Sequence, residues 1–518
     1  MEQQLSYDLM LPLEQIALRR VAVVLWNEPD ILTSVGKFQE SLEYGDYRKK
    51  WRETVECEVS DKISKLQLPE SLMKQMMQIF KPIGLQILRW KVFHEAYFTP
   101  EEYFYPCEYI DVPILEKLCW TAAGRVDYRK TAEELIRCNV VDIVKRYKLA
   151  CLYCLDHYIP EIWNELPQQN KMYFYNKKEL AVIRLLLLQF CWPYILKGEQ
   201  NKLALMPVRS SRDPKTFHQH IFTCASITGN KTAVKYFFQK LSPKEREASL
   251  ISAAKSALRS RNVELDNYFS RFPKENVTDV VFYLLSLMDP EQQSRFFRER
   301  PCDVLECFLD WPWQDAFLGV ADAMWTWMQY GNLKRRTRNY DTLLDKMQRS
   351  IQCSDCYLPS LYQNFFRRSP SDFRKHFADR ECRFGTFFTE LFNIQDTETV
   401  NVILRNVDSG DRVRLASSKH IFKHFNNFIS RGSVHVVEMC LRETGLSKED
   451  KKRVKEDFMV FLKRRDRGQI EWGAPKWRRF FEFLDETDAS AQSKRSLDDE
   501  ALPEAKKLCC QKKENPTM

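Results

Sequence analysis

Glycine is scarce in this sequence. Of 518 residues, 14 are glycine, whereas β-rich folds and phosphate-binding loops use glycine at many of their turns. The glycine-based motifs G-x-S-x-G, G-x-x-x-x-G-K-[ST] and G-x-G-x-x-G do not occur. The sequence therefore favours helices joined by short connections, and it offers none of the common nucleotide-binding or nucleophile loops.

Signals for export and membrane insertion are also lacking. The opening MEQQLSYDLMLPLEQ has no basic segment followed by an apolar run, so we expect no secretory leader. The most apolar run, 180–196, is interrupted by Arg184, Gln189 and Pro193, and we interpret it as a buried helix rather than a membrane span. The 16 cysteines lack the spacing of a disulfide scaffold, which predicts reduced thiols in the cytosol or nucleus.

Apolar and aromatic residues are plentiful. They make up 44% and 13% of the chain, which is enough for a core and excludes disorder for most of the length. A single compact core does not extend over 518 residues. Several domains or a continuous stack of repeats are therefore expected. The net charge of +9 is mild at this length and is no nucleic-acid signature by itself.

An amphipathic helical pattern recurs along the chain. Its clearest copy has Val234, Phe237, Phe238 and Leu241 on one helix face. The same valine-led spacing begins at four other positions, Val140, Val281, Val400 and Val437. The intervals of 94, 47, 119 and 37 residues fit one to three units of about forty residues. Stretches 343–351 and 384–392 are candidates for units in between.

Four of the five copies run directly into a helix cap. Ser242-Pro243-Lys244-Glu245 combines a capping hydroxyl, a proline at the first helical position and a glutamate that closes a capping box. The other caps begin at Asp289, Asp408 and Ser447. One helix thus ends where another starts, and such short helices must stack on neighbours to bury their apolar faces.

The best copy has an A-x-x-x-G-N-x-x-x-V-x-x-x-x-x-L skeleton over 221–241, which resembles the two helices of an ankyrin repeat. The resemblance implies that Ala225 lies between the helices. It also implies that Gly229 and Asn230 form the turn between them, and that Val234 and Leu241 belong to the core of the outer helix.

Elsewhere the ankyrin pattern is weaker. Arg431-Gly432 supply the turn in the last copy, and Asn139 and Asn276 stand before theirs. There is no T-P-L-H opening, the spacing exceeds 33 residues, and capped helix starts replace the glycine-bearing turn between repeats. We therefore expect an all-α fold, a diverged ankyrin-like solenoid of helical hairpins, with a generic α-solenoid as the alternative.

Three segments are predicted. Residues 1–115 form a helical N-terminal module, 116–485 the ankyrin-like solenoid, and 486–518 a disordered basic tail, because that last segment loses its apolar periodicity. In the module, the helix that begins near Leu11 is expected to bury Leu18, Val21 and Leu25. A polar linker is expected over 45–65.

Two cysteine groups have spacing compatible with metal binding. Cys151-x-x-Cys154-x-x-His157 and Cys353-x-x-Cys356 lie about two hundred residues apart, whereas structural zinc needs four ligands in one place. The first group lies in a stretch that we interpret as the middle of a helix, where this spacing also marks a buried stripe. We expect packing positions, and no metal or other cofactor.

The histidines give no better catalytic site. His420 and His424 have the spacing of zinc proteases, but Ile421 stands where the glutamate base would be. His218 and His220 are predicted in a surface loop. We expect surface histidines in both pairs, no catalytic residue and no enzymatic activity.

Basic residues cluster near the C-terminal end of the chain. A possible basic patch comprises Arg335, Arg464, Arg465 and Arg478, which would suit phosphates or an acidic partner, although a solvated, positively charged end of the stack is the favoured interpretation. A bipartite nuclear-import pattern comprises Lys494, Arg495, Lys506 and Lys507. The expected location is therefore cytoplasmic, nuclear or both.

Leu11-Pro12-Leu13-Glu14, followed by Ile16 and Val21, resembles the opening of an F-box. The resemblance implies a helix that docks on a ubiquitin-ligase scaffold. The function favoured by the whole sequence is a non-enzymatic protein–protein interaction scaffold that binds one or more protein partners, with no membrane. The alternatives are an F-box-like substrate adaptor of a ubiquitin ligase and a nucleic-acid-binding α-solenoid.

Overall fold

The computed structural model describes nine stretches of the chain. They are 11–38, 47–99, 109–175, 188–203, 216–261, 272–329, 333–352, 358–466 and 475–485. Over these residues the predicted all-α fold is confirmed, and the sole β pairing there is an isolated bridge between Trp120 and Val126. No helix within these stretches is both long and apolar enough to cross a membrane.

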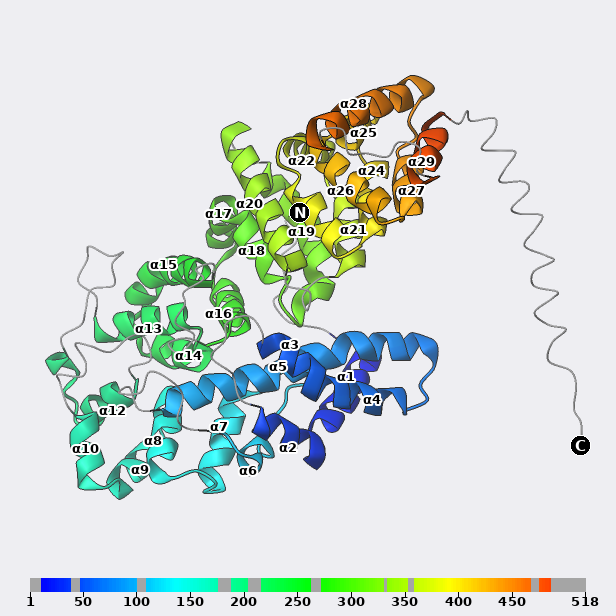
Figure 1. Ribbon diagram of the computed structural model, residues 1–518. Coiled ribbons are helices and arrows are strands. Elements are labelled where there is room, and N and C mark those ends of the chain that lie inside the picture. The colour runs from blue at the N-terminus through cyan, green and yellow to red at the C-terminus, as the bar shows by residue number, and fades with distance from the viewer. Residues whose placement is uncertain are drawn as a thin grey trace, which may run out of the picture. The chain divides into compact units, whose positions relative to one another are not determined.

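The chain forms two compact units, residues 1–320 and 321–518 (Figure 1). The helices that lie in the first unit are α1 (Leu13–Trp26), α2 (Pro29–Lys37), α3 (Tyr47–Trp51), α4 (Cys57–Ser64), α5 (Glu70–Phe98), α6 (Val112–Leu115), α7 (Tyr128–Arg137), α8 (Ile143–Leu152), α9 (Ile159–Glu165), α10 (Gln168–Phe174), α12 (Leu188–Leu196), α13 (Phe217–Thr228), α14 (Lys231–Lys240), α15 (Pro243–Arg261), α16 (Lys274–Ser286), α17 (Pro290–Glu299) and α18 (Pro301–Cys307).

The N-terminal helices pack around the long helix α5. Trp26 of α1 lies so close to Gly84 of α5 that a Cβ on that glycine would stand 2.1 Å from the indole ring. The Trp26 Nε1 donates to the carbonyl oxygen of Phe80 at 2.9 Å. Glycine is therefore required where the two helices cross, because any side chain there would push them apart.

The linker predicted over 45–65 is wrong for its described residues. Residues 47–64 form α3, a π-helical turn over 52–56, and α4. Trp51, Val55, Val59 and Ile63 are buried, and Trp51 stacks on Trp26 with ring centroids 5.8 Å apart. Four buried residues spaced by four positions are a helical stripe, hidden in the sequence by the charged residues between them.

The hairpin of α13 and α14 forms as the sequence predicts. Gly229 ends α13 in the left-handed conformation at φ +85°, and the Asn230 side chain caps α14 by accepting from the Ala233 amide at 3.0 Å. Ser242 and Glu245 exchange the hydrogen bonds of a capping box before α15. Val234, Phe237 and Leu241 are buried, as the predicted face requires, and its fourth member, Phe238, is half-buried.

The helices of the second unit follow the end of α19 (Phe317–Met328). They are α20 (Leu333–Gln352), α21 (Pro359–Arg368), α22 (Ser371–Phe384), α23 (Thr386–Asn393), α24 (Thr397–Arg405), α25 (Ser409–Ala416), α26 (Lys419–Ser430), α27 (Val434–Glu443), α28 (Lys448–Asp466) and α29 (Pro475–Asp485).

Contacts in the second unit have a period of three helices. Helices α20, α23, α26 and α29 contact one another in that order, as do α21, α24 and α27, and likewise α22, α25 and α28. The starts of α21, α24 and α27 are 38 and 37 residues apart, and those of α22, α25 and α28 are 38 and 39 apart. Each helix thus packs against the helix one period later.

Grouped by this period, the helices form the triplets α20–α22, α23–α25 and α26–α28, and the valine-led stripes at 400 and 437 lie on the second helix of a triplet. Val400 of α24 and Val437 of α27 are both fully buried, as is Val281 of α16 in the first unit. The caps that follow open α17, α25 and α28. Capping boxes form at Asp289 and Ser447, whereas Asp408 precedes α25 without a capping bond from its side chain.

Two parts of the repeat pattern are wrong. Val140 precedes α8, whose N-cap is Asp142, so that valine cannot share a helix face with Tyr147. Asn276 lies within the first turn of α16 rather than in a turn between helices. In each case a capping residue or proline, Asp142 or Pro273, sets the start of the helix.

Candidate functional site

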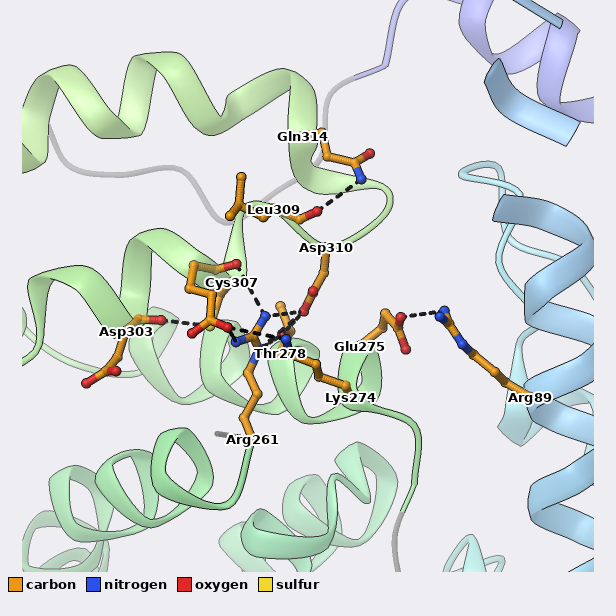
Figure 2. Close-up of polar contacts among 11 residues, drawn as sticks. Arg89, Arg261, Lys274, Glu275, Thr278, Asp303, Cys307, Leu309, Asp310 and Gln314 are labelled. Atoms are coloured by element: carbon orange, nitrogen blue, oxygen red, sulfur yellow. Dashed lines mark hydrogen bonds and ion pairs between the residues drawn. The ribbon is translucent and has the colours of Figure 1, made fainter. Parts of the chain in front are cut away.

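The densest polar cluster in the described residues surrounds Arg261, at the end of α15 (Figure 2). Its Nη2 lies 2.8 Å from Asp310 Oδ2, and its Nη1 lies 2.9 Å from Glu306 Oε1. The Thr278 hydroxyl of α16 donates to the same Asp310 oxygen at 2.6 Å. Lys274 adds a second cation to Glu306 at 3.3 Å. The cluster joins α15, α16 and the chain around α18.

Burial decides what this cluster can do. The Arg261 side chain is fully buried and that of Asp310 is 12% exposed. Burial alone would raise the pKa of Asp310, but Arg261, Lys274 and the Thr278 hydroxyl together outweigh it and lower that pKa below its ordinary value. Nearby, burial raises the pKa of the Cys307 thiol to about 11. The charges hold each other, and neither a proton donor nor a thiolate is available for chemistry.

Two further ion pairs connect α16 to earlier parts of the first unit. Arg89 of α5 pairs with Glu275 (Figure 2), and Arg125 pairs with Asp279 at 2.5 Å. The Arg125 and Asp279 side chains are 11% and 18% exposed. Removing one partner of such a pair would leave a poorly solvated charge. These pairs fix the position of α16.

His94 is a buried histidine that we did not single out from the sequence. Its Nδ1 lies 2.8 Å from the Trp90 carbonyl oxygen and its Nε2 lies 2.8 Å from the Tyr153 hydroxyl. Burial lowers the pKa of His94 to about 3, so the ring is neutral at ordinary pH. Both nitrogens are engaged within the core, which indicates a structural histidine.

The cysteine group on α8 is not arranged along the middle of a helix. Cys151 lies in the last turn, whereas Cys154 follows the helix at φ +48°, and His157 is exposed. The predicted packing role of Cys151 and Cys154 agrees with their burial, which raises the pKa of both thiols. Within the described residues no three His, Cys, Asp or Glu side chains could hold a metal ion. Cys353 and Cys356 lie outside them.

The histidine pairs differ from the predictions. His218 and His220 lie in the first turn of α13, not in a loop, because Thr216 and Gln219 cap that helix. His220 is buried, with its Nε2 3.6 Å from the Cys224 sulfur. A hydroxyl–glutamine capping box was present in the sequence as T-x-x-Q and could have placed this helix.

His420 and His424 both lie on α26, and each contacts a different partner on other helices. Nε2 of His420 lies 3.2 Å from the Arg383 carbonyl oxygen. His424 is buried and stacks on Phe392 at 4.8 Å. Burial, with the charges of Lys423 and His420, lowers the pKa of His424 to about 4. The surface position predicted for His424 is therefore wrong.

The predicted basic patch falls on three helices of the second unit. Arg335 lies on α20 and is half-buried, Arg464 lies on α28 and is exposed, and Arg478 lies on α29 and is exposed. Arg465 lies in α28, and its side chain is outside the described part of the structure. The import residues Lys494, Arg495, Lys506 and Lys507 lie outside the described residues, as does the predicted disordered tail.

The neighbours of these arginines are partly neutralised. Arg336 pairs with Asp372 at 2.7 Å. Arg479 makes a two-pronged pair with Glu438, at 2.8 and 2.9 Å. The sequence clusters are therefore not uniformly cationic surfaces, because helical geometry sends consecutive arginines to different sides of a helix.

Helix α1 presents an apolar row to solvent. Leu13 is 85% exposed, Val21 41% and Val24 55%, and Ala17 is also exposed between them. The spacing of four, four and three residues places all four on one face. Val21 was predicted to be buried with Leu18 and Leu25, which is wrong. Counting Leu13, Ala17, Val21 and Val24 as a second stripe could have revealed it.

The opposite side of α1 is tightly fixed. Arg19 is 2% exposed, donates to the Ala123 carbonyl oxygen at 3.0 Å, and lies over the Trp311 ring at 4.1 Å. Burial lowers the pKa of Arg19 to about 10, and the charge of Asp315 opposes this shift. Together with Trp26, these contacts set the rotation of α1. The apolar row is therefore held outward.

Comparison with known protein families finds no family model that matches the chain, and comparison with curated proteins finds no match either.

Proposed function

We propose that this protein is a non-enzymatic scaffold for protein–protein interaction, and that the outward row of α1, Leu13, Ala17, Val21 and Val24, is a docking surface. The exposure of that row is the observation that carries the proposal. Apolar side chains that lie together on a surface are typical of binding sites. The row extends over roughly 16 Å at 1.5 Å per residue, the size of a contact with one helix of a partner.

The repeat in the second unit supports a solenoid. Seven helix pairs separated by three positions are in contact, and the second and third helices of successive triplets start 37 to 39 residues apart. A chain that stacks on its neighbours in this way presents a long surface whose exposed residues vary independently of the core. The first two helices of each triplet would correspond to the ankyrin-like hairpin, and the third helix would replace the turn between repeats.

A scaffold role also agrees with the polar clusters. The groups that approach one another most closely around Arg261 are buried and mutually paired. His94 is likewise engaged at both nitrogens. Such clusters stabilise and specify a fold.

The experiment is affinity capture of the full chain from lysate of its source cells, with quantitative mass spectrometry. The variant Leu13→Glu/Val24→Glu should lose bound proteins that the unchanged chain retains. Met172 of α10 is 67% exposed, so Met172→Glu is a matched control that should retain them. Identical sets of captured proteins for all three would contradict a docking role for α1.

The F-box-like adaptor is the second candidate, because Leu13 and Val21 of the F-box-like stretch are exposed on α1. An adaptor would co-purify with a ubiquitin-ligase scaffold, and Val21→Glu should abolish that association. A substitution is preferable to deleting the first forty residues, since Arg19 and Trp26 belong to the core. Persistence of the ligase scaffold on the Val21→Glu variant would reject this candidate.

A further inference from the structure

The exposed side of α26 is a row of hydrogen-bond donors. Lys419 and Lys423 are exposed one turn apart, followed by the half-buried Asn427 and the exposed Ser430. These positions share one helix face. The other sides of α26 contact α22, α23, α25, α27, α28 and α29. The row is therefore the side of α26 that its neighbours leave uncovered.

More cations lie where the row ends. Lys476 of α29 donates its Nζ to the Ser430 carbonyl oxygen at 3.0 Å, and the next residue, Arg431, is exposed. Among the described residues no carboxylate pairs with Lys419 or Lys423. Two carboxylates of neighbouring helices are engaged with other cations. Glu438 binds Arg479, and Asp379 binds Arg414 at 2.7 Å.

The surplus of positive charge is concentrated in the second unit. Residues 321–518 contain 37 Lys and Arg against 29 Asp and Glu, whereas residues 1–320 contain 43 against 42. Almost the whole surplus of the protein thus belongs to the unit that carries α26. A field of one sign attracts anions and speeds their association.

An exposed aromatic ring lies near the start of the row. Phe384 is 56% exposed and precedes Gly385, where a Cβ would stand 2.2 Å from His420. His420 is the neighbour of Lys419, so the ring and the lysine belong to the same end of α26. Arg383 lies over the Phe384 ring at 5.6 Å. A solvent-facing ring beside cations is a platform on which a nucleobase can stack.

We propose that this surface, defined by Phe384, Lys419, Lys423, Arg431 and Lys476, binds single-stranded nucleic acid. The cations would track the phosphate backbone, and Phe384 would stack on one base. A single exposed ring among cations suits the repeating alternation of phosphate and base in a single strand, whereas protein interfaces centre on a cluster of buried apolar and aromatic anchors. Phosphates are bound by charge alone. The proposal is independent of the docking role of α1.

The test is fluorescence anisotropy of the full chain with a labelled twenty-nucleotide oligouridine, measured from about 50 to 300 mM KCl. Each phosphate contact on a single strand contributes a slope of about −0.7 to log K against log salt. Lys419→Glu/Lys423→Glu should therefore weaken binding at low salt and reduce the slope by about 1.4. Lys49 and Lys50 of α3 are both exposed. Lys49→Glu/Lys50→Glu makes the same charge change and should retain the affinity and slope.

Phe384→Ala separates stacking from charge. It should weaken oligouridine binding roughly tenfold and leave binding of a duplex of the same length unchanged. Three results would overturn the proposal: no salt-dependent binding, an equal loss in the α3 control, or competition by polyglutamate as effective as that by unlabelled oligouridine. Equal loss of single-strand and duplex binding in Phe384→Ala would overturn the assignment of a single strand.

Discussion

The two units hold their neighbouring helices together by different means. In residues 1–320, charged side chains cross the core, as in Arg261 with Asp310, Arg125 with Asp279, and Lys91 with the Phe38 carbonyl oxygen at 2.9 Å. In residues 321–485, apolar rows make the contacts between successive triplets, and pairs such as Arg405 with Glu443 lie at the surface. The first arrangement fixes one set of partners, and the second can be repeated along a chain.

The difference explains what substitution should do in each unit. A buried pair costs much to break because the remaining charge stays desolvated, whereas an exposed pair is replaced by water. Apolar rows should be similarly sensitive in both units, since removing a buried aromatic ring loses its transfer free energy and leaves a cavity in either. The expected loss of stability is therefore largest for a buried ion pair and smallest for an exposed one.

The largest effect is expected at Arg261. Arg261→Ala leaves Asp310 and Glu306 buried without their main cation, and should lower the local free energy of unfolding by about 3–5 kcal/mol. Native-state hydrogen exchange of the amides in α15 and α16 measures this quantity. Arg261→Met/Asp310→Ala should recover part of the loss. A loss below about 1 kcal/mol would place the cluster with ordinary surface pairs.

The next largest loss of stability is expected when a buried aromatic residue of an apolar row is replaced. Phe237 of α14 and Phe365 of α21 are both buried, and replacing either with alanine should cost about 3 kcal/mol in its own unit. Lys235 is exposed on α14, so Lys235→Ala should change stability by less than about 0.5 kcal/mol. Hydrogen exchange or urea unfolding provides the comparison. Equal effects for Phe237 and Lys235 would show that the helix face is misassigned.

The stability of the fold should depend on pH through Glu381, which lies near the end of α22 and is 1% exposed. Its carboxylate accepts the amides of Phe387 and Phe388 at the start of α23, at 3.3 and 3.1 Å. Burial raises the pKa of Glu381 to about 7, although those amides and Arg380 oppose the shift.

The sign follows from proton uptake. Between its ordinary pKa and about 7, the folded protein holds the Glu381 proton more tightly than the unfolded chain does. Stability therefore falls as pH rises through that window. Glu381→Gln should be more stable than the unchanged chain at pH 8, by roughly 1–3 kcal/mol, with little gain at pH 5. Thermal unfolding at both pH values checks this, and an equal gain at both would contradict it.

The smallest loss of stability is expected on replacing Arg405. Its side chain is 56% exposed, and Arg405→Ala should cost no more than about 1 kcal/mol, an effect that should shrink in high salt. Urea unfolding at low and high salt measures it. A loss as large as that of Arg261→Ala would remove the distinction between the two units.

The capped helical stripes were predictable because they are local. A stripe and its cap lie within about fifteen residues, so Val234, Val281, Val400 and Val437 could be found without knowing the fold. One copy was missed. Tyr362, Phe365 and Phe366 are buried on α21 with the same spacing, 38 residues before the Val400 copy. The search for a leading valine passed over it because tyrosine fills that position.

The ion pairs that connect the helices of the first unit were not predictable. Arg261 and Asp310 are 49 positions apart and Arg89 and Glu275 are 186 apart, and no local pattern marks such partners. The exposed row of α1 was partly predictable, since the F-box-like stretch includes Leu13 and Val21. Its outward rotation depends on Arg19 and Trp26, whose partners lie far along the chain.

The stacking of equivalent helices can be measured directly. Arg367, Arg405 and Glu443 are 38 residues apart at the ends of α21, α24 and α27. Spin labels carried by an unnatural amino acid avoid the 16 native cysteines. With 8–10 Å between packed helices, double electron–electron resonance should place labels at 367 and 443 about 20 Å apart, with position 405 between them. Labels in direct contact, or more than about 35 Å apart, would contradict the repeating stack.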